Sequence, residues 1–505
     1  MIRRAMVCVV MFVWWMIPCG LAMAQVSRTG TLFTPDTVTQ RAREMAEHPF
    51  TEPDVPLPKA LRDLDYDQYR RIQYLPTYVV PWSDAAFRFR PFHRGHFHAD
   101  QVRLNIVTDG RSYPWRYDST QFQYDNVVDP SKLPADLGYA GFKVLCRLNR
   151  PDRWDELISF LGASYFRALG QGQVYGTSCR GLAIDTGLNM AEEFPYFREF
   201  WVAADNGDSN DSAITIYALM DSQSLTGSYQ FIVTPGKDTT VAVHATIFAR
   251  KDITKLGIAP LTSMYHHGKA EPDPNDYRPE VHDADGLLIA MGDGHWVWRV
   301  LRNPAENQES YFVMDSPRGF GLIQRERDFA QYQDFEAHYH QRPSIWIEPI
   351  GSWGKGTLDL MELHDPDETF DSVVAQWTPE KPLKAGQSMT FDYRMTTMLG
   401  EPVQHPGGRC VATRRGFTHS GELRYVLDFT GPELAKLAES DPPKADVLVN
   451  NQKPRNLVVQ PHPYIQGWRV SFDMPRDRKG KTIEMLAKLV YGGRDVTETW
   501  SDRWP

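Results

Sequence analysis

Short runs of β-branched and aromatic residues, separated by glycine, proline, asparagine and aspartate, fill the chain from about residue 70 to residue 395. The clearest run, Thr240 to Phe248, has an apolar residue at every second position, as a half-buried strand does. No stretch alternates helical and strand patterns in the way that a parallel α/β sheet requires. The pattern therefore predicts a mainly β protein with large, stacked antiparallel sheets. Further runs of this kind are Ala213 to Met220, Ser228 to Val233, Leu287 to Ala290, His295 to Val300, Ser344 to Ile347 and Thr357 to Met361.

A length of 505 residues exceeds what one hydrophobic core ordinarily organises, so we expect more than one domain. Residues 399–408 are rich in turn-forming residues and lack apolar periodicity, which is typical of a linker. Residues 409–505 then hold several short strand-like runs, spaced as in an immunoglobulin-like sandwich. We therefore expect a large β-sandwich domain over residues 25–398 and a small immunoglobulin-like β-sandwich over residues 409–505.

Residues 1–24 have the features of a secretory signal peptide. Arg3 and Arg4 give a charged start, Ala5 to Gly20 is an apolar run, and Ala22-Met23-Ala24 offers small residues at the cleavage site. We expect cleavage before Gln25, with an uncleaved membrane anchor as the alternative. The two arginines lack the flanking residues of a twin-arginine signal, which favours the general secretory route.

Composition and motifs exclude several classes of function. The net charge of −9 and the pI of about 5.9 show no excess of basic residues such as nucleic-acid-binding proteins have, so we expect no nucleic acid partner. Nucleotide phosphate loops, nucleophile elbows and HExxH metal helices are all missing from the sequence. The three cysteines after the signal are too far apart for a disulfide framework or a zinc pattern. His266-His267 and the DxDG of Asp283 to Gly286 match metal patterns only weakly, so we expect no metal and no cofactor.

The remaining chemistry is carried by carboxylates among aromatic residues. Acidic residues cluster in three stretches, 276–285, 328–336 and 365–371. Glycoside hydrolysis uses one carboxylic acid to protonate the leaving oxygen and one carboxylate to activate water or attack carbon. Aromatic faces can stack on sugar rings, although core packing is the alternative for each tryptophan, as a solvated loop is for 365–371. The tryptophans among these clusters are Trp296, Trp298, Trp346, Trp353 and Trp377.

Several long strings in the chain are similar to those of one protein family. They resemble the periplasmic glucan biosynthesis proteins G and D of Gram-negative bacteria, from about residue 50 to the C-terminus and most densely over residues 138–377. The strings include Phe160-Leu-Gly-Ala-Ser-Tyr-Phe-Arg-Ala-Leu169, Arg180-Gly-Leu-Ala-Ile-Asp-Thr186, Arg278-Pro-Glu-Val-His-Asp283 and Pro317-Arg-Gly-Phe-Gly-Leu322.

The resemblance implies a fold, a location and a ligand. The expected fold is an N-terminal β-sandwich of the galactose-mutarotase type with a small C-terminal immunoglobulin-like sandwich. The expected location is the periplasm, and the expected ligand is the β-1,2-glucan backbone of osmoregulated periplasmic glucans. The absence of a twin-arginine signal leans towards the G type. The inner-membrane glucan synthase is a candidate partner, and a homodimer is left open.

The family also includes inverting β-1,2-glucan hydrolases, and its motifs carry over to two acids. Asp283, the last residue of the RPEVHD string, matches the base-side residue, and Asp371 matches the general acid. Phe370 and Ser372 flank Asp371, and Phe370 stands where the family usually has asparagine. Inverting carboxyls stand roughly 6.5–9.5 Å apart, and a relay of water or substrate hydroxyls allows a longer separation. Candidate substrate-binding residues are Arg278, Glu280, Asp285, Trp296, Trp298, Glu336 and Trp353. We expect Trp296 or Trp298 to line the groove that binds the glucan.

Three functions remain open from the sequence. The first is an enzyme that cuts or trims β-1,2-glucan, and the second is a glucan-binding factor without catalytic activity that assists the membrane synthase. A glucosyl transferase is a third, but the sequence offers no nucleotide-sugar site.

Overall fold

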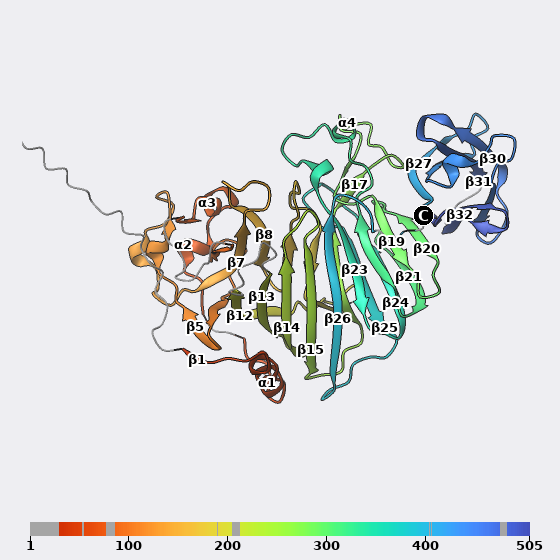
Figure 1. Ribbon diagram of the computed structural model, residues 1–505. Coiled ribbons are helices and arrows are strands. Elements are labelled where there is room, and N and C mark those ends of the chain that lie inside the picture. The colour runs from red at the N-terminus through yellow and green to blue at the C-terminus, as the bar shows by residue number, and fades with distance from the viewer. Residues whose placement is uncertain are drawn as a thin grey trace, which may run out of the picture.

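The computed structural model describes residues 30–52, 55–76, 86–188, 190–204, 213–402, 405, 407–474 and 482–504, and strands dominate it (Figure 1). The predicted mainly β class is confirmed. The alternation predicted for Thr240 to Phe248 is also present, since Val241 and Ile247 are fully buried in the core. The expected signal peptide, residues 1–24, lies outside the described residues. Within the described residues, no helix is long and apolar enough to cross a membrane.

Two large sheets pack face to face and enclose the main hydrophobic core. Phe231 of the larger sheet meets Phe160 and Phe166 of the smaller one, with ring centroids 5.2 Å apart in each pair. In order across the larger sheet, the described strands are β1 (Thr31–Leu32), β5 (Arg111–Trp115), β4 (Arg103–Thr108), β12 (Tyr196–Ala204), β13 (Ile214–Asp221), β14 (Leu225–Thr234), β15 (Thr240–Ala249), β26 (Ser388–Met398), β23 (Ser344–Ile350), β22 (Gly319–Ile323), β19 (Gly286–Ala290), β20 (Trp296–Val300), β34 (Thr499–Trp504), β32 (Ile483–Tyr491) and β29 (Lys444–Val449), with β33 (Arg494–Asp495) beside β32.

The second large sheet and two small ones position the polar residues discussed below. The second sheet runs β21 (Gln308–Asp315), β24 (Lys355–Glu362), β25 (Val373–Pro379), β16 (Leu256–Ser263), β10 (Ser178–Arg180), β9 (Tyr165–Ala168), β8 (Asp155–Leu161), β7 (Tyr139–Cys146) and β3 (Arg88–His93), with β11 (Leu182–Ile184) beside β16. The small pairs are β17 (Tyr265–His267) with β18 (Val281–His282), and β2 (Gln73–Tyr74) with β6 (Phe122–Gln123).

Helices are short and peripheral. The longest described helix, α1 (Pro35–Ala46), begins after Thr34, whose backbone N–H donates to the Thr37 hydroxyl, and it has proline at its first position. It buries Val38 and Ala42 against β13, β14 and β15. The other described α-helices are α2 (Lys59–Arg62), α3 (Tyr66–Arg70) and α4 (Phe329–Tyr332); α4 and β17 stand above the same end of the sheets (Figure 1).

The C-terminal strands form a second sandwich that shares a sheet with the first. Tyr425 and Phe472 stack 5.6 Å apart and meet Trp500 in a separate core. However, β34 pairs in parallel with β20, and the pairing begins with Val297 opposite Thr499. Backbone hydrogen bonds therefore join the two sandwiches. The boundary expected at residues 399–408 therefore stays a prediction. The four-stranded sheet is β27 (Arg409–Phe417), β28 (Leu423–Thr430), β31 (Gly467–Met474) and β30 (Arg455–His462).

Candidate active site

Asp283 and Asp371 lie on separate segments that are anchored to Met264 and Tyr265, where the chain passes from β16 to β17. The Asp283 backbone N–H donates to the carbonyl of Met264 over 2.9 Å. The backbone N–H of the next residue, Tyr265, donates to Ser372 Oγ over 3.2 Å. Because Ser372 directly follows Asp371, these two bonds bring both acids to the same end of β16.

The two acids differ in their exposure to water. Asp283 is 4% exposed, whereas Asp371 is exposed and lies two residues before β25. Burial raises the pKa of Asp283, the Arg342 guanidinium beside it lowers that pKa, and the charge of Asp371 raises it further. Arg342 forms an ion pair with Asp283 and stacks over the ring of Tyr339, 4.4 Å from its centroid. One carboxyl group is therefore buried and the other is exposed to water, and the charge of Asp371 is close enough to affect the pKa of Asp283.

Arg278 ties the three acidic clusters of the sequence together. Its guanidinium pairs with Asp276 at 2.7 Å, with Asp334 at 2.9 Å and with Glu368 at 2.6 Å. The hydrogen bond from Arg278 lowers the pKa of Asp276. Glu368 also accepts a hydrogen bond from the hydroxyl of Tyr339 at 3.2 Å. Since Glu368 stands three residues before Asp371, this cluster fixes the segment that carries the exposed acid.

A polar row crosses the second large sheet beside these acids. The strand register places Lys143 opposite Ser159, and Ser159 opposite Arg167. The Arg167 Nε–H donates to Ser178 Oγ over 2.6 Å. A cavity of about 390 Å³ opens on this face, lined by Tyr165, Arg167 and Ser178 among others.

This cavity lies next to the acid pair. The charge of Arg167 lowers the pKa of Asp283, and the charge of Asp371 contributes to the raised pKa of Tyr165. Arg180 stacks over Tyr165, with its guanidinium carbon 4.9 Å from the ring centroid. Sequence reasoning about acids and tryptophans missed Tyr165, Arg167 and Arg180. Their signal was present in the two strings, 160–169 and 180–186, that carried the family resemblance.

The comparison with known families now bears on this geometry. The sequence model of a family described as periplasmic glucan biosynthesis protein, MdoG, matches residues 33–504. The chain belongs to the MdoG family. It is a periplasmic protein of glucan biosynthesis, and the resemblance seen in the sequence is confirmed.

In this MdoG-family chain, Glu280 and Asp285 lie away from the acid pair. Successive side chains of an extended segment point to opposite sides, so Glu280 and His282 share the side opposite Asp283. The chain bends between β18 and β19 and brings Asp285 to within 3.4 Å of His282. These three residues face a small cavity that β27 closes through Cys410 and its neighbours.

The structure places Trp296 and Trp298 in a hydrophobic core, which corrects the expectation that one of them lines the groove. They are 7% and 2% exposed and belong to the core between the larger sheet and the C-terminal sandwich. Trp296 stacks on Trp346 with ring centroids 5.7 Å apart, and the guanidinium carbon of Arg325 lies 3.6 Å from the ring centroid of Trp298. Both side chains leave β20 on the face that the C-terminal sandwich covers.

Trp353 stands apart from Asp283, whereas Glu336 precedes Ala337, whose carbonyl accepts a hydrogen bond from Arg342 over 3.1 Å. Trp353 donates its indole N–H to the carbonyl of Asp392 and follows the end of β23 that is remote from Arg342. The seven residues of β23 span about 20 Å. Glu336 is exposed, and its backbone N–H donates to Asp334 Oδ1. Of the expected substrate-binding residues, Arg278 is therefore the one that the structure connects directly to the segment carrying Asp371.

Proposed function

We propose that this protein is an inverting endo-hydrolase of the β-1,2-glucan backbone, which sets the structure of periplasmic glucan. The observation that carries the proposal is that hydrogen bonds to Met264 and from Tyr265 bring the segments of Asp283 and Asp371 to the same end of β16, beside a polar cavity. Inverting glycoside hydrolysis needs two carboxyl groups in one site, one that donates a proton and one that receives it. The family supplies the glucan pathway.

The proposed reaction assigns one proton transfer to each acid. Asp371 protonates the glycosidic oxygen as the bond from that oxygen to the anomeric carbon breaks. A water oxygen then forms the new bond to carbon from the opposite face, and its proton passes to Asp283 directly or through a hydroxyl relay. Arg342 acts against the effect of burial on the pKa of Asp283 and orients the carboxylate that receives that proton.

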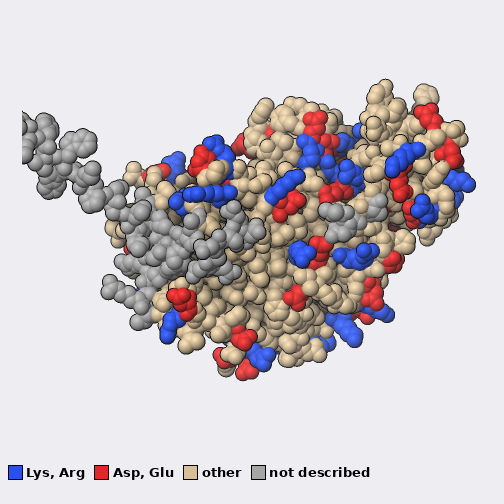
Figure 2. All heavy atoms as spheres, in the orientation of Figure 1, with Lys and Arg blue, Asp and Glu red and all other residues tan. Residues whose placement is uncertain are grey.

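The polar row provides groups that suit a sugar chain. Arg167 offers guanidinium donors for hydroxyl groups, and the partly buried ring of Tyr165 beside it offers a pyranose the face that Arg180 does not cover. Figure 2 shows basic and acidic side chains interspersed over one face of the molecule, which suits a neutral polysaccharide better than a polyanion.

A glucan-binding factor without catalytic activity remains the second candidate. The ion pair between Arg342 and Asp283 favours it, because a carboxylate neutralised by arginine is a weaker base. In that case the same cavity would hold glucan for the membrane synthase without cutting it.

Incubation of the mature protein with linear β-1,2-glucan tests both candidates. Reducing ends report cleavage, and NMR of the first products reports their anomeric form. Release of α-anomeric oligosaccharides is expected. Initial release of the β-anomer would contradict the inverting mechanism, and glucan that is retained but not cut would favour the binding factor.

A further inference from the structure

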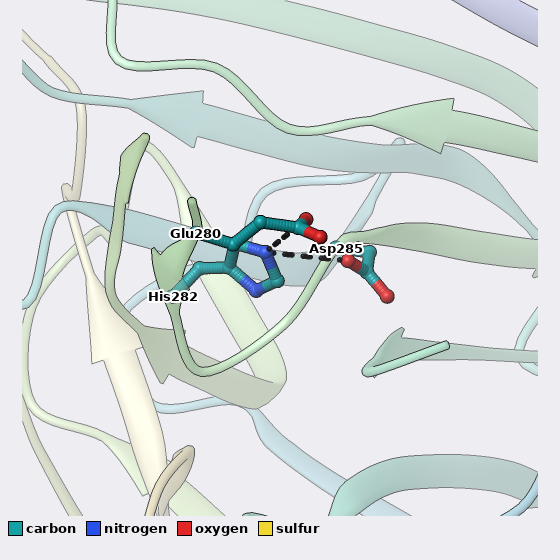
Figure 3. Close-up of side chains that lie close together, drawn as sticks. All are labelled: Glu280, His282 and Asp285. Carbon is teal, nitrogen blue, oxygen red and sulfur yellow. Dashed lines mark hydrogen bonds and ion pairs between the residues drawn. The ribbon is translucent and has the colours of Figure 1, made fainter. Parts of the chain in front are cut away.

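Three ligand-type atoms converge behind Asp283, on the other side of β18. His282 Nε2 lies 3.1 Å from Glu280 Oε2 and 3.4 Å from Asp285 Oδ1 (Figure 3). The three atoms lie within 4.8 Å of one another, and His282 is 1% exposed. This cluster takes no part in the proposed hydrolysis.

Gln324 determines which nitrogen of His282 carries hydrogen. The Gln324 amide N–H groups donate to the carbonyls of His282 and Tyr339, at 3.0 and 3.2 Å. Its Oε1 must therefore face His282 Nδ1, 2.8 Å away, and an amide oxygen only accepts. Nδ1 consequently donates, and the lone pair of Nε2 points at two carboxylates. Such a contact requires a positive charge between them, carried by a second proton or by a metal ion.

In each candidate ligand, the polar atom that would not bind the ion also has a partner. The second carboxylate oxygen of Glu280 pairs with Lys269 at 3.2 Å. The second oxygen of Asp285 accepts the backbone N–H groups of Arg325 and Glu326, the latter at 2.8 Å. Metal ligands in proteins characteristically have partners of this kind, which orient the atom that binds the ion.

Spacing and charge both suit a small divalent cation. Ligands about 2.0–2.1 Å from a tetrahedral zinc ion lie about 3.3 Å from each other, close to the two distances measured at His282. An adjoining cavity of about 50 Å³ leaves room for a water as a further ligand. Glu280, Asp285 and Glu326 bring three negative charges, and Lys269 and Arg327 bring two positive ones, so the cluster keeps a net negative charge for a cation.

We propose that Glu280, His282 and Asp285 bind a divalent zinc-type ion that has a structural role. One nitrogen and two carboxylate oxygens form a ligand set that such ions accept. The ion would hold the segment that carries Asp283 against residues 324–326, which follow β22. In that segment, Arg325 donates hydrogen bonds to the Cys410 carbonyl over 2.7 Å and to Glu498 over 2.6 Å, both in the C-terminal part of the chain. The proposal departs from the sequence expectation of no metal, because an ExHxxD spacing matches none of the patterns considered there.

Metal content of the whole mature protein is the first test, and it needs no glucan. The protein is stripped with a chelator, loaded with Zn²⁺, desalted and analysed for bound zinc, and in parallel titrated with Co²⁺ in the visible range. We expect one zinc per chain, a tetrahedral Co²⁺ spectrum and a raised Tm after loading. Wild-type protein that keeps no zinc and gives no Co²⁺ spectrum would overturn the proposal and leave His282 doubly protonated.

Two histidine variants locate the ion. His282→Gln should lose the bound zinc and the Co²⁺ spectrum. His267→Gln is the matched control, because His267 is also buried on this hairpin but its Nε2 has one carboxylate, Asp276, at 3.4 Å. The control should bind zinc as wild type does. Loss of zinc from His267→Gln, with zinc retained by His282→Gln, would place the ion elsewhere. If His282→Gln does not fold, Asp285→Asn replaces it.

Discussion

Asp283 and Glu498 are both buried carboxylates paired with arginine, yet their surroundings shift the pKa in opposite directions. Glu498 receives hydrogen bonds from both terminal nitrogens of Arg325, from the Cys410 backbone and from His405. Although burial acts to raise its pKa, Arg325 and His405 lower it to about 2. Asp283 has Arg342 as its hydrogen-bond partner among the described residues, and its pKa is raised.

The contrast separates a stabilising acid from a reactive one. Glu498 belongs to the junction, the charged side chains buried between the main sheets and the C-terminal sandwich: Arg299, Arg302, Arg325, Glu362, Glu498 and Asp502. Asp283 belongs to the cleft side, with Asp371, Arg342 and Arg167. A buried carboxylate with several ion pairs and hydrogen bonds stabilises the fold. A carboxyl group with fewer hydrogen bonds and a second carboxyl group nearby can exchange a proton. Changes on the cleft side should therefore alter activity, and changes at the junction should alter stability.

Asp371→Asn should give the largest effect. An amide cannot donate the proton that the leaving oxygen needs, so kcat for linear β-1,2-glucan should fall by about 10²–10⁴-fold. Unfolding should change little because Asp371 is exposed. Asp109→Asn, in the exposed turn between β4 and β5, is the control and should keep full activity. Hydrolysis by Asp371→Asn at the wild-type rate would remove Asp371 from the mechanism.

Arg325→Met should give the opposite profile. It leaves Glu498 and Glu401 buried without the guanidinium that lies 2.6 and 3.1 Å away, which should cost about 3–5 kcal/mol of unfolding free energy. Urea denaturation measures that loss, and kcat of the folded fraction should stay near wild type. A large loss of kcat without loss of stability would show that the junction and the cleft side are not separate.

Glu362→Gln tests the junction through pH. Burial raises the pKa of Glu362 to about 7, while Arg299 and the backbone N–H of Arg302 act to lower it. A carboxyl with a raised folded pKa contributes stability below its unfolded pKa of about 4.3, and that stability is lost as pH rises through about 7. Glutamine does not titrate, so between pH 5 and 8 the variant should gain about 1–3 kcal/mol relative to wild type. Parallel stability curves for the two proteins would contradict the assignment.

The sequence predicts features that depend on neighbouring residues, but not contacts between segments that are far apart in the chain. Period-two alternation predicts strands such as β15, because the signal lies within ten residues. The tryptophans of β20 show the limit, since alternation places Trp296 and Trp298 on one face but does not say which layer covers it. That layer comes from the C-terminal sandwich, about 110 residues further along, since Trp298 and Cys410 of β27 belong to one core and line the same cavity. The pairing of Arg325 with Glu498, 173 residues apart, has no local signal either.

The smallest expected effect is that of Arg278→Met, on the rim of the cleft side. Arg278 acts through Glu368 on the segment that carries Asp371, so its loss should reduce kcat about tenfold by misplacing the acid. Ion pairs near the surface contribute about 0.2–1 kcal/mol each, so stability should fall far less than in Arg325→Met. A positioning role predicts that Arg278→Lys restores part of kcat, while Arg394→Met, whose side chain is 4.0 Å from Glu348, changes nothing. Unchanged kcat in Arg278→Met would show that Asp371 is positioned without this ion cluster, and the cleft side would then comprise the two acids, Arg342 and the polar row.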